Sequence, residues 1–170
     1  MTGTTALSLG GLLAALLILY ANLRPWWVGN REMKRLAPFG KGFGGAACAA
    51  ACPGGILGWA HSRSGTVANA AGERAGEGAT GASQTQSLTT GQLTGLGMTG
   101  ATIVVLVVFA VGLSWKAAGK DDKKRIAGGA FVGSVLCLTA GVAGLLAWLP
   151  GALNGVGDAV VKAAEGAGAL

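Results

Sequence analysis

The chain has 170 residues, of which 51% are hydrophobic and 12% charged, and its mean hydropathy is +0.55. Soluble domains average about 25% charged residues, so this composition excludes a conventional soluble core. Thirteen lysines and arginines against seven acidic residues give a net charge of +6. With 32 glycines and few aromatic residues, the sequence predicts an all-α integral membrane protein with closely packed helices.

Residues 1–23 are expected to form an N-terminal membrane anchor. Ala6–Leu23 is an unbroken apolar run with no charge before it, whereas Arg24, Trp26 and Trp27 follow it. A secretory signal would carry its basic residues first and end in a small-residue cleavage site. The observed order predicts an uncleaved anchor with its basic flank in the cytoplasm and its tryptophans at the headgroup level.

Residues 24–44 hold five basic residues and one acidic residue. The simplest interpretation is a cytoplasmic loop, because the cationic loops of membrane proteins stay inside. Clustered lysine and arginine beside a membrane would also suit anionic lipid or nucleic acid. The glycines around Lys41 do not complete the G-x-x-x-x-G-K-[ST] pattern of a phosphate-binding loop.

Residues 45–60 are uncharged, weakly hydrophobic and interrupted by Pro53. They suit a kinked span, a re-entrant segment or an interfacial one. If they cross the membrane, four spans place both chain ends outside and both basic segments in the cytoplasm. A second interpretation takes Arg31–Lys41 as the basic part of a cleaved signal, with the cleavage site at residues 60–62.

Cys48 and Cys52 lie four residues apart and would share one helix face. The chain has no second cysteine pair, and His61 is its only histidine, so the spacing of a zinc site is missing. We therefore predict no metal site. The two cysteines are interpreted as small side chains suited to a membrane, with a metal or redox role as the alternative.

Residues 61–98 are rich in small and polar residues and have almost no bulky side chain before Leu88. Such a segment buries little apolar surface, so we expect a flexible or partner-ordered outer loop. The tail, residues 150–170, is weakly amphipathic and suits an interfacial helix or a subunit contact. Its polar residues lie three or four apart, on one helical face: Asn154, Asp158, Lys162 and Glu165.

Residues 99–149 are predicted to form a transmembrane helical hairpin. Ala101–Trp115 and Ile126–Leu149 carry no charge, and Lys116–Arg125 between them has five basic residues against two acidic ones. A membrane helix needs about 20 apolar residues. The second run meets this length alone, and the uncharged Leu93–Gly100 lengthens the first.

Small residues recur every four positions along the second run. Such a face lets helix backbones approach closely in lipid, where packing drives association. The residues expected to pack are Gly129, Gly133, Cys137 and Gly141. Tryptophans at the ends of the runs are expected to anchor the two membrane interfaces: Trp26, Trp27, Trp115 and Trp148.

The predicted spans contain no ionisable residue, which argues against an ion path or a proton relay. No carboxylate pair shares a face, and no serine–histidine–aspartate set assembles around His61. We therefore predict no enzyme, no catalytic residue and no cofactor apart from bound phospholipid.

The segment Ala110–Leu146 resembles the major pilin subunits of type IV secretion and conjugation systems. Those are small proteins of two apolar helices joined by a short basic loop. Gly112-Leu113-Ser114-Trp115 matches the G-[IL]-S-W stretch that enters the loop, and Gly128–Gly144 matches the glycine-rich second helix. The similarity covers Leu88–Leu149.

This resemblance implies a subunit that waits in the cell membrane and is extracted into a surface filament beside other secretion-apparatus subunits. It also implies that the basic loop faces the filament lumen and neutralises lipid phosphate. Ammonium and guanidinium groups suit phosphate oxygens on chemical grounds as well. The loop residues concerned are Lys116, Lys120, Lys123, Lys124 and Arg125.

Two functions follow as hypotheses. The first is a homo-oligomeric, pilin-like or channel-forming subunit of an apparatus that transfers DNA or protein, without sequence-specific nucleic-acid binding. The second is a small accessory membrane protein that binds a partner or anionic lipid through its two basic segments and forms no filament.

Overall fold

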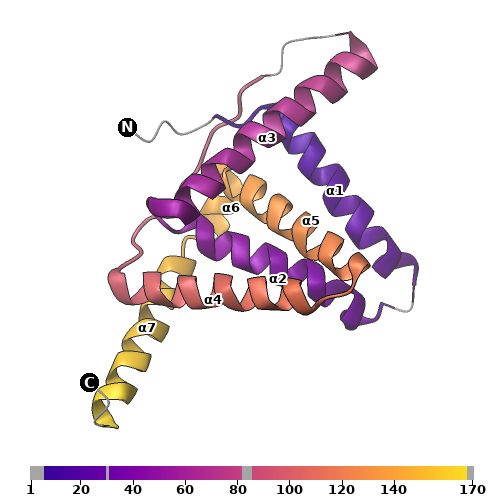
Figure 1. The fold of residues 1–170 in the computed structure, drawn as a ribbon. Coiled ribbons are helices and arrows are strands. Elements are labelled where there is room, and N and C mark those ends of the chain that lie inside the picture. Colours follow the sequence, from indigo (N-terminus) through magenta and orange to yellow (C-terminus); the bar gives the residue numbers. More distant parts are fainter. Residues whose placement is uncertain (1–5, 30, 82–85, 168–170) are drawn as a thin grey trace.

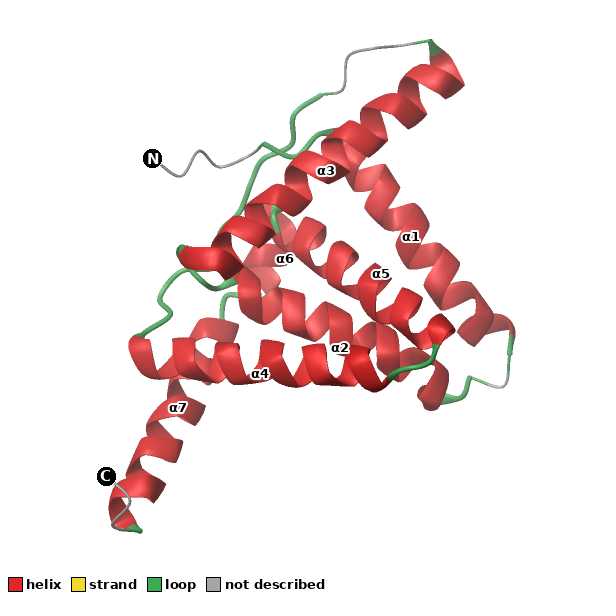
Figure 2. Cartoon of the chain, in the orientation of Figure 1, coloured by secondary structure: helices red, strands yellow, loops and turns green. Residues whose placement is uncertain are grey.

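The computed structural model describes residues 6–29, 31–81 and 86–167, and within these ranges it contains seven helices and no strand (Figure 1 and Figure 2). The predicted all-α fold is confirmed. The helices are α1 (Leu9–Val28), α2 (Met33–Ala50), α3 (Gly55–Thr80), α4 (Met98–Ala117), α5 (Lys120–Cys137), α6 (Ala140–Leu145) and α7 (Leu149–Gly166).

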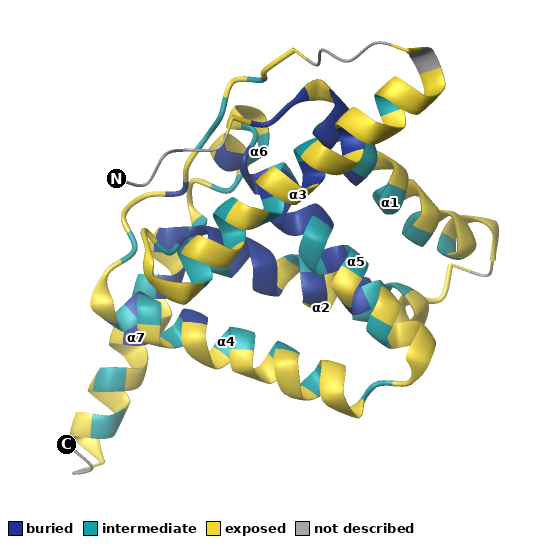
Figure 3. Ribbon diagram, turned by 45° about the horizontal axis from the view of Figure 1, so that its top comes forward, coloured by how far each residue is buried: buried dark blue, intermediate teal, exposed yellow. Residues whose placement is uncertain are grey.

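Two helices, α1 and α4, are long and apolar enough to cross a membrane, and the pair α2–α3, bent by 111°, is a third candidate. The run Ala101–Trp115 lies within α4, as predicted. Helix α1 continues beyond its apolar run through Arg24 and Pro25 to Val28. Both helices expose large apolar side chains along much of their length, so they form the outer walls of the bundle (Figure 3).

Helices α2 and α5 form the centre of the bundle and run parallel to each other (Figure 1). A Cβ atom on Gly42 would meet the carbonyl oxygen of Ile126, and one on Gly129 would meet that of Phe39. One turn further along α5, a Cβ on Gly133 would lie 2.8 Å from the carbonyl oxygen of Phe43. Glycine is therefore what lets the two backbones touch along this seam.

The second apolar run differs from the prediction of one spanning helix. Ile126–Leu149 is divided, because α5 ends at Cys137 and the short α6 begins at Ala140. The charged residues Lys120–Arg125 form the first turns of α5, so only residues 118–119 connect it to α4. Since α5 packs mainly against α2, the two apolar runs do not form the predicted hairpin.

An extended segment explains where this break falls. The amide of Gly91 donates a 2.9 Å hydrogen bond to the carbonyl of Leu138, and the amide of Ala140 donates a 3.2 Å bond to the carbonyl of Thr89. The hydroxyl of Thr139 also accepts a 3.4 Å bond from the amide of Val142. These bonds provide partners for backbone groups that an interrupted helix would otherwise leave without one.

Residues 61–98 also differ from the prediction of a loop, because α3 extends through Thr80. Alanine favours the helix, and Gly72 lets α3 approach the backbone of α1 at Gly10. Asn69 ties the two segments together, accepting a 2.8 Å bond from the amide of Ser8 and donating one of 2.8 Å to the carbonyl of Ala6. The contact with α1 thus orders a segment that could not order itself.

Residues 45–60 form the bend between α2 and α3 and not a straight crossing helix. The tail is helical through Gly166, and α7 packs against the first turns of α4 before it projects from the bundle (Figure 1). Two residues of its polar face, Asn154 and Asp158, contact the start of α4 and the residues just before it. The hydroxyl of Thr99 donates a 2.8 Å bond to Asp158, and Asn154 bonds to the backbone at Gly95 and Gly97.

Candidate functional site

The two predicted basic segments meet at one end of the central helix pair. Because α2 and α5 run parallel, both begin there, and the guanidinium of Arg125 donates a 2.7 Å hydrogen bond to the backbone carbonyl of Arg35. Helices α1 and α4 end at the same place, since only residues 29–32 and 118–119 connect them to α2 and α5. Four helix ends therefore surround this region.

We call this region the cationic end and define it by its nine basic residues: Arg24, Arg31, Lys34, Arg35, Lys116, Lys120, Lys123, Lys124 and Arg125. Three acidic residues lie on the same segments: Glu32, Asp121 and Asp122. Nine positive and three negative charges leave +6, which equals the net charge of the whole chain. The remaining four basic and four acidic residues cancel, so the charge asymmetry of the protein resides at this end.

Most cations at this end remain available to an external anion. The Nζ of Lys124 lies 4.0 Å from the Oδ1 of Asp121, and both side chains are more than four-fifths exposed. The Nε of Arg35 lies 3.7 Å from the Oε2 of Glu32, and both of these side chains are about half exposed. Ion pairs as exposed as these contribute little and exchange readily. Asp121 and Asp122 also occupy the first turn of α5, where the positive end of the helix dipole stabilises carboxylates.

Aromatic rings support the cations. The Nζ of Lys123 lies 5.4 Å from the ring centroid of Trp115, and the Cζ of Arg31 lies 4.8 Å from that of Trp27. Trp26 packs edge-on against Trp27 at 6.0 Å. The cationic end thus combines positive charge with amphipathic rings, the combination found where membrane proteins meet lipid headgroups.

The predicted anchor Trp148 lies away from the cationic end. It directly precedes α7, which packs near Thr99 at the start of α4, whereas Trp115 belongs to the last turn of α4. Trp148 is 63% exposed. The two tryptophans consequently lie toward opposite ends of α4.

The predicted packing face is only partly continuous. Gly129 and Gly133 contact the α2 backbone and Cys137 is buried beside them, whereas a Cβ on Gly141 would meet nothing within 4 Å. The reason is the break between Cys137 and Ala140, which places Gly141 on α6. This small-residue face packs against α2 of the same chain. The four-residue spacing of the small residues could not reveal that partner.

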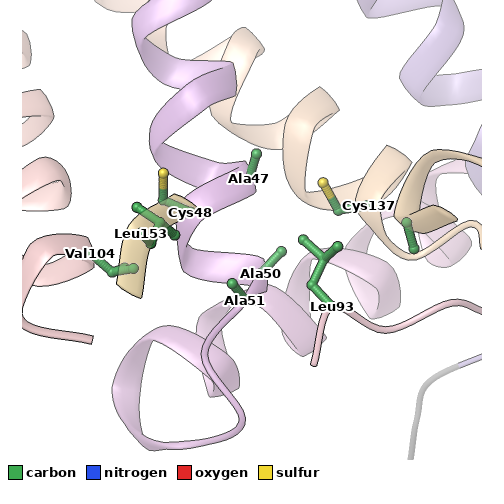
Figure 4. Packing of buried hydrophobic residues seen from close by; sticks show 9 residues of the cluster. Ala47, Cys48, Ala50, Ala51, Leu93, Val104, Cys137 and Leu153 are labelled. Carbon is green, nitrogen blue, oxygen red and sulfur yellow. The ribbon is translucent and has the colours of Figure 1, made fainter. Parts of the chain in front are cut away.

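Cys48 and Cys137 belong to one buried apolar cluster (Figure 4), Cys52 is partly buried against it, and all three cysteines are free. Cys48 belongs to α2, Cys52 follows that helix, and Cys137 ends α5. Among the residues that the structure describes, no group of three or more histidine, cysteine or acidic side chains could hold a metal ion. Alanine, valine and leucine side chains surround the cysteines, so the arrangement is that of a packed core.

The sequence did not single out Arg35 or the pairing of Lys123 with Trp115. Arg35 reaches Arg125 across 90 positions of sequence through the parallel packing of α2 and α5, and no local pattern signals that contact. Lys123 follows Trp115 by eight positions across a helix break, which conceals their proximity as well. Comparison with known proteins adds no family: no family model, curated protein or solved structure matches this chain.

Proposed function

We propose that this chain is an integral membrane protein whose cationic end binds anionic phospholipid headgroups at the cytoplasmic surface. The observation that carries the proposal is the meeting of both basic segments at the Arg125–Arg35 contact. A single basic loop would serve only to orient a membrane protein, whereas two converging segments concentrate charge on one surface.

The dimensions of α1 and α4 support the membrane placement. Each has 20 residues, which at 1.5 Å per residue gives about 30 Å, the thickness of the hydrocarbon layer. Both helices end at the cationic end. Arg24 and Lys116, in the last turns of these helices, therefore lie at the same end of the molecule, which the preference of basic residues for the inside assigns to the cytoplasmic surface.

The energetics favour lipid phosphate as the partner. Each lysine or arginine near an anionic leaflet contributes about 1 kcal/mol of attraction, and this attraction falls off within a Debye length of about 10 Å. The net excess of six charges therefore makes several simultaneous phosphate contacts favourable. Tryptophan rings beside the cations, Trp27 and Trp115, suit the same depth at the headgroup level.

A self-assembling, pilin-like or channel-forming subunit of a transfer apparatus is the second candidate function. The exposed apolar face of α4 favours it, because Leu106, Phe109 and Leu113 are each more than half exposed and offer a surface to another copy. The glycine face of α5 does not supply this surface, since α2 covers it. In this alternative the five basic residues from Lys116 to Arg125 would meet lipid inside the assembly.

The test replaces Lys123 and Lys124 with glutamine, which removes two charges from the cationic end. Wild type and variant are purified identically from the same membranes, and their bound lipid is quantified by mass spectrometry. We expect at least a two-fold loss of anionic phospholipid with zwitterionic lipid unchanged. The matched control replaces Lys41 and Lys162, two exposed lysines outside the cationic end, and should retain wild-type lipid content.

Unchanged anionic lipid in the Lys123/Lys124 variant would leave the cationic end with an orienting role only. Electron microscopy of the purified protein and of sheared cell-surface material separates the two candidate functions. Discrete particles agree with the accessory protein, and filaments would favour the pilin-like subunit.

A further inference from the structure

A cavity of about 190 Å³ lies where α2, α3, α4 and α5 meet. Its wall is almost entirely apolar and contains no charged residue. The polar side chains that line it are His61 and Ser64 of α3 and Ser134 of α5. The cavity lies well away from the chain termini and shares no residue with the cationic end.

Two of these polar groups have no hydrogen-bond partner among the residues that the structure describes. The Nδ1 atom of His61 is buried without a hydrogen bond, and the Ser134 hydroxyl makes none with the described residues although that residue is only 8% exposed. Ser64 differs, because its hydroxyl donates a 3.0 Å bond to the carbonyl of Ala60. The buried Nδ1 of His61 without a partner costs about 1–3 kcal/mol, and the Ser134 hydroxyl lines the same cavity, so the pair favours a ligand that hydrogen-bonds to both.

An apolar groove of about 490 Å³ adjoins this cavity, and the two share Leu57 and Val108 in their walls. The groove runs between the start of α3 and the middle of α4. Val105 and Phe109 line it and are 58% and 63% exposed, so the groove opens onto the outer apolar face of α4. A hydrocarbon chain could enter from the side along this face.

The position along α4 determines which ligand can reach the site. Val108 is the eleventh of the 20 residues of α4, which places the cavity about 15 Å along that helix, near the middle of the hydrocarbon layer. Charged headgroups do not partition to that depth without charged partners. The ligand must therefore be uncharged, largely hydrocarbon, and able to hydrogen-bond at one end.

We propose that this cavity and groove bind a neutral membrane amphiphile, with its hydrocarbon body in the groove and its single hydroxyl or carbonyl oxygen between His61 and Ser134. The combined site falls in the size range of small-molecule pockets and has their usual form, an apolar wall with few polar groups. The inference uses the membrane placement of the proposed function but not its lipid-phosphate contacts. It applies equally to a protein that forms filaments.

Photolabelling of the full-length protein in detergent micelles tests this site. The probe is a long-chain alcohol with a diazirine at mid-chain, and the comparison probe is the same chain ending in methyl. Peptide mapping should place most alcohol labelling on the groove residues Ile56, Val105 and Phe109, at several times the level reached by the methyl probe. Excess unlabelled hexadecanol should suppress this labelling.

Substitutions then separate hydrogen bonding from simple apolar contact. His61→Phe and Ser134→Ala should each reduce alcohol labelling about five-fold, the effect of one neutral hydrogen bond, and leave methyl-probe labelling unchanged. The control Ser62→Ala changes a neighbouring hydroxyl that already bonds to Trp59 and lines neither space. It should label like wild type.

A variant that fills the groove, Val108→Trp, should abolish labelling by both probes at these residues. Circular dichroism and size-exclusion chromatography confirm that each variant is folded before it is labelled. Equal labelling by the two probes would overturn the proposal, as would alcohol labelling that survives both His61→Phe and Ser134→Ala. Labelling spread evenly along the outer faces of α1 and α4 would overturn it too.

Discussion

The guanidinium of Arg125 donates a 2.7 Å hydrogen bond to the backbone carbonyl of Arg35, a residue 90 positions earlier in the chain. This contact joins the first turn of α2 to the early turns of α5. It also explains why the charge of the protein lies on one surface, since each helix brings its own basic segment to the same place. The seam that holds the contact in register is the line of glycines between the two helices.

Adding one methyl group to a glycine should destabilise the protein only where that glycine lies in the seam between α2 and α5. Gly129→Ala forces a Cβ atom against the carbonyl of Phe39, and overpacking of this kind costs about 1–3 kcal/mol. Gly141→Ala is the matched control, because its Cβ would meet nothing within 4 Å. Thermal unfolding in detergent should show a clearly lower melting temperature for Gly129→Ala and no decrease in melting temperature for Gly141→Ala. Equal stability of the two variants would mean that α2 and α5 do not touch here.

Thr139 is expected to stabilise the break in the second apolar run. Its hydroxyl accepts a bond from the amide of Val142 and donates a 2.7 Å bond to the carbonyl of Leu136. Loss of an N-cap costs about 1 kcal/mol, so Thr139→Val should lower the free energy of unfolding by about that amount. Thr102→Val removes a hydroxyl that bonds only within exposed α4, and its effect should be smaller. If residue 139 instead lay in a continuous helix in lipid, valine would be favourable there and Thr139→Val would not lower the free energy of unfolding.

These elements show how far the sequence could predict the fold. Apolar runs identified α4 and the start of α1, because length and hydropathy are local properties. The break at Thr139 depends on Thr89 and Gly91, about 50 positions earlier, which supply its backbone partners. No window of hydropathy contains that information.

The candidate site, too, could be predicted from the sequence only in part. The sequence indicated which residues are cationic and that Gly129 and Gly133 would pack closely, since charge and small-residue spacing are readable along the chain. It did not reveal that α2 is the packing partner or that Arg35 lies beside Arg125. Nor did it reveal α3, whose order depends on the contact of Gly72 with α1.

Asn69 is predicted to hold the N-terminal segment against α3. Its side chain bonds to the amide of Ser8 and to the carbonyl of Ala6, both at 2.8 Å. Asn69→Ala removes both bonds, so we expect faster amide hydrogen exchange at residues 7–9 and at Leu88, whose amide bonds to Leu7. Exchange in the seam around Gly133 should not change. Uniform acceleration across the chain would indicate global destabilisation and not the loss of a local tie.

The central claim is that both basic segments, which form the cationic end, lie on one side of the membrane. This claim can be measured directly. In a chain whose three cysteines are replaced by alanine, single cysteines are introduced at Met33 in the first basic segment and at Ala118 in the second, neither of which is buried. A membrane-impermeant maleimide is then applied to intact cells and to inside-out vesicles. We predict that both positions react in the inside-out vesicles and that neither reacts in intact cells. Reaction of one position from each side would separate the two segments and contradict the account.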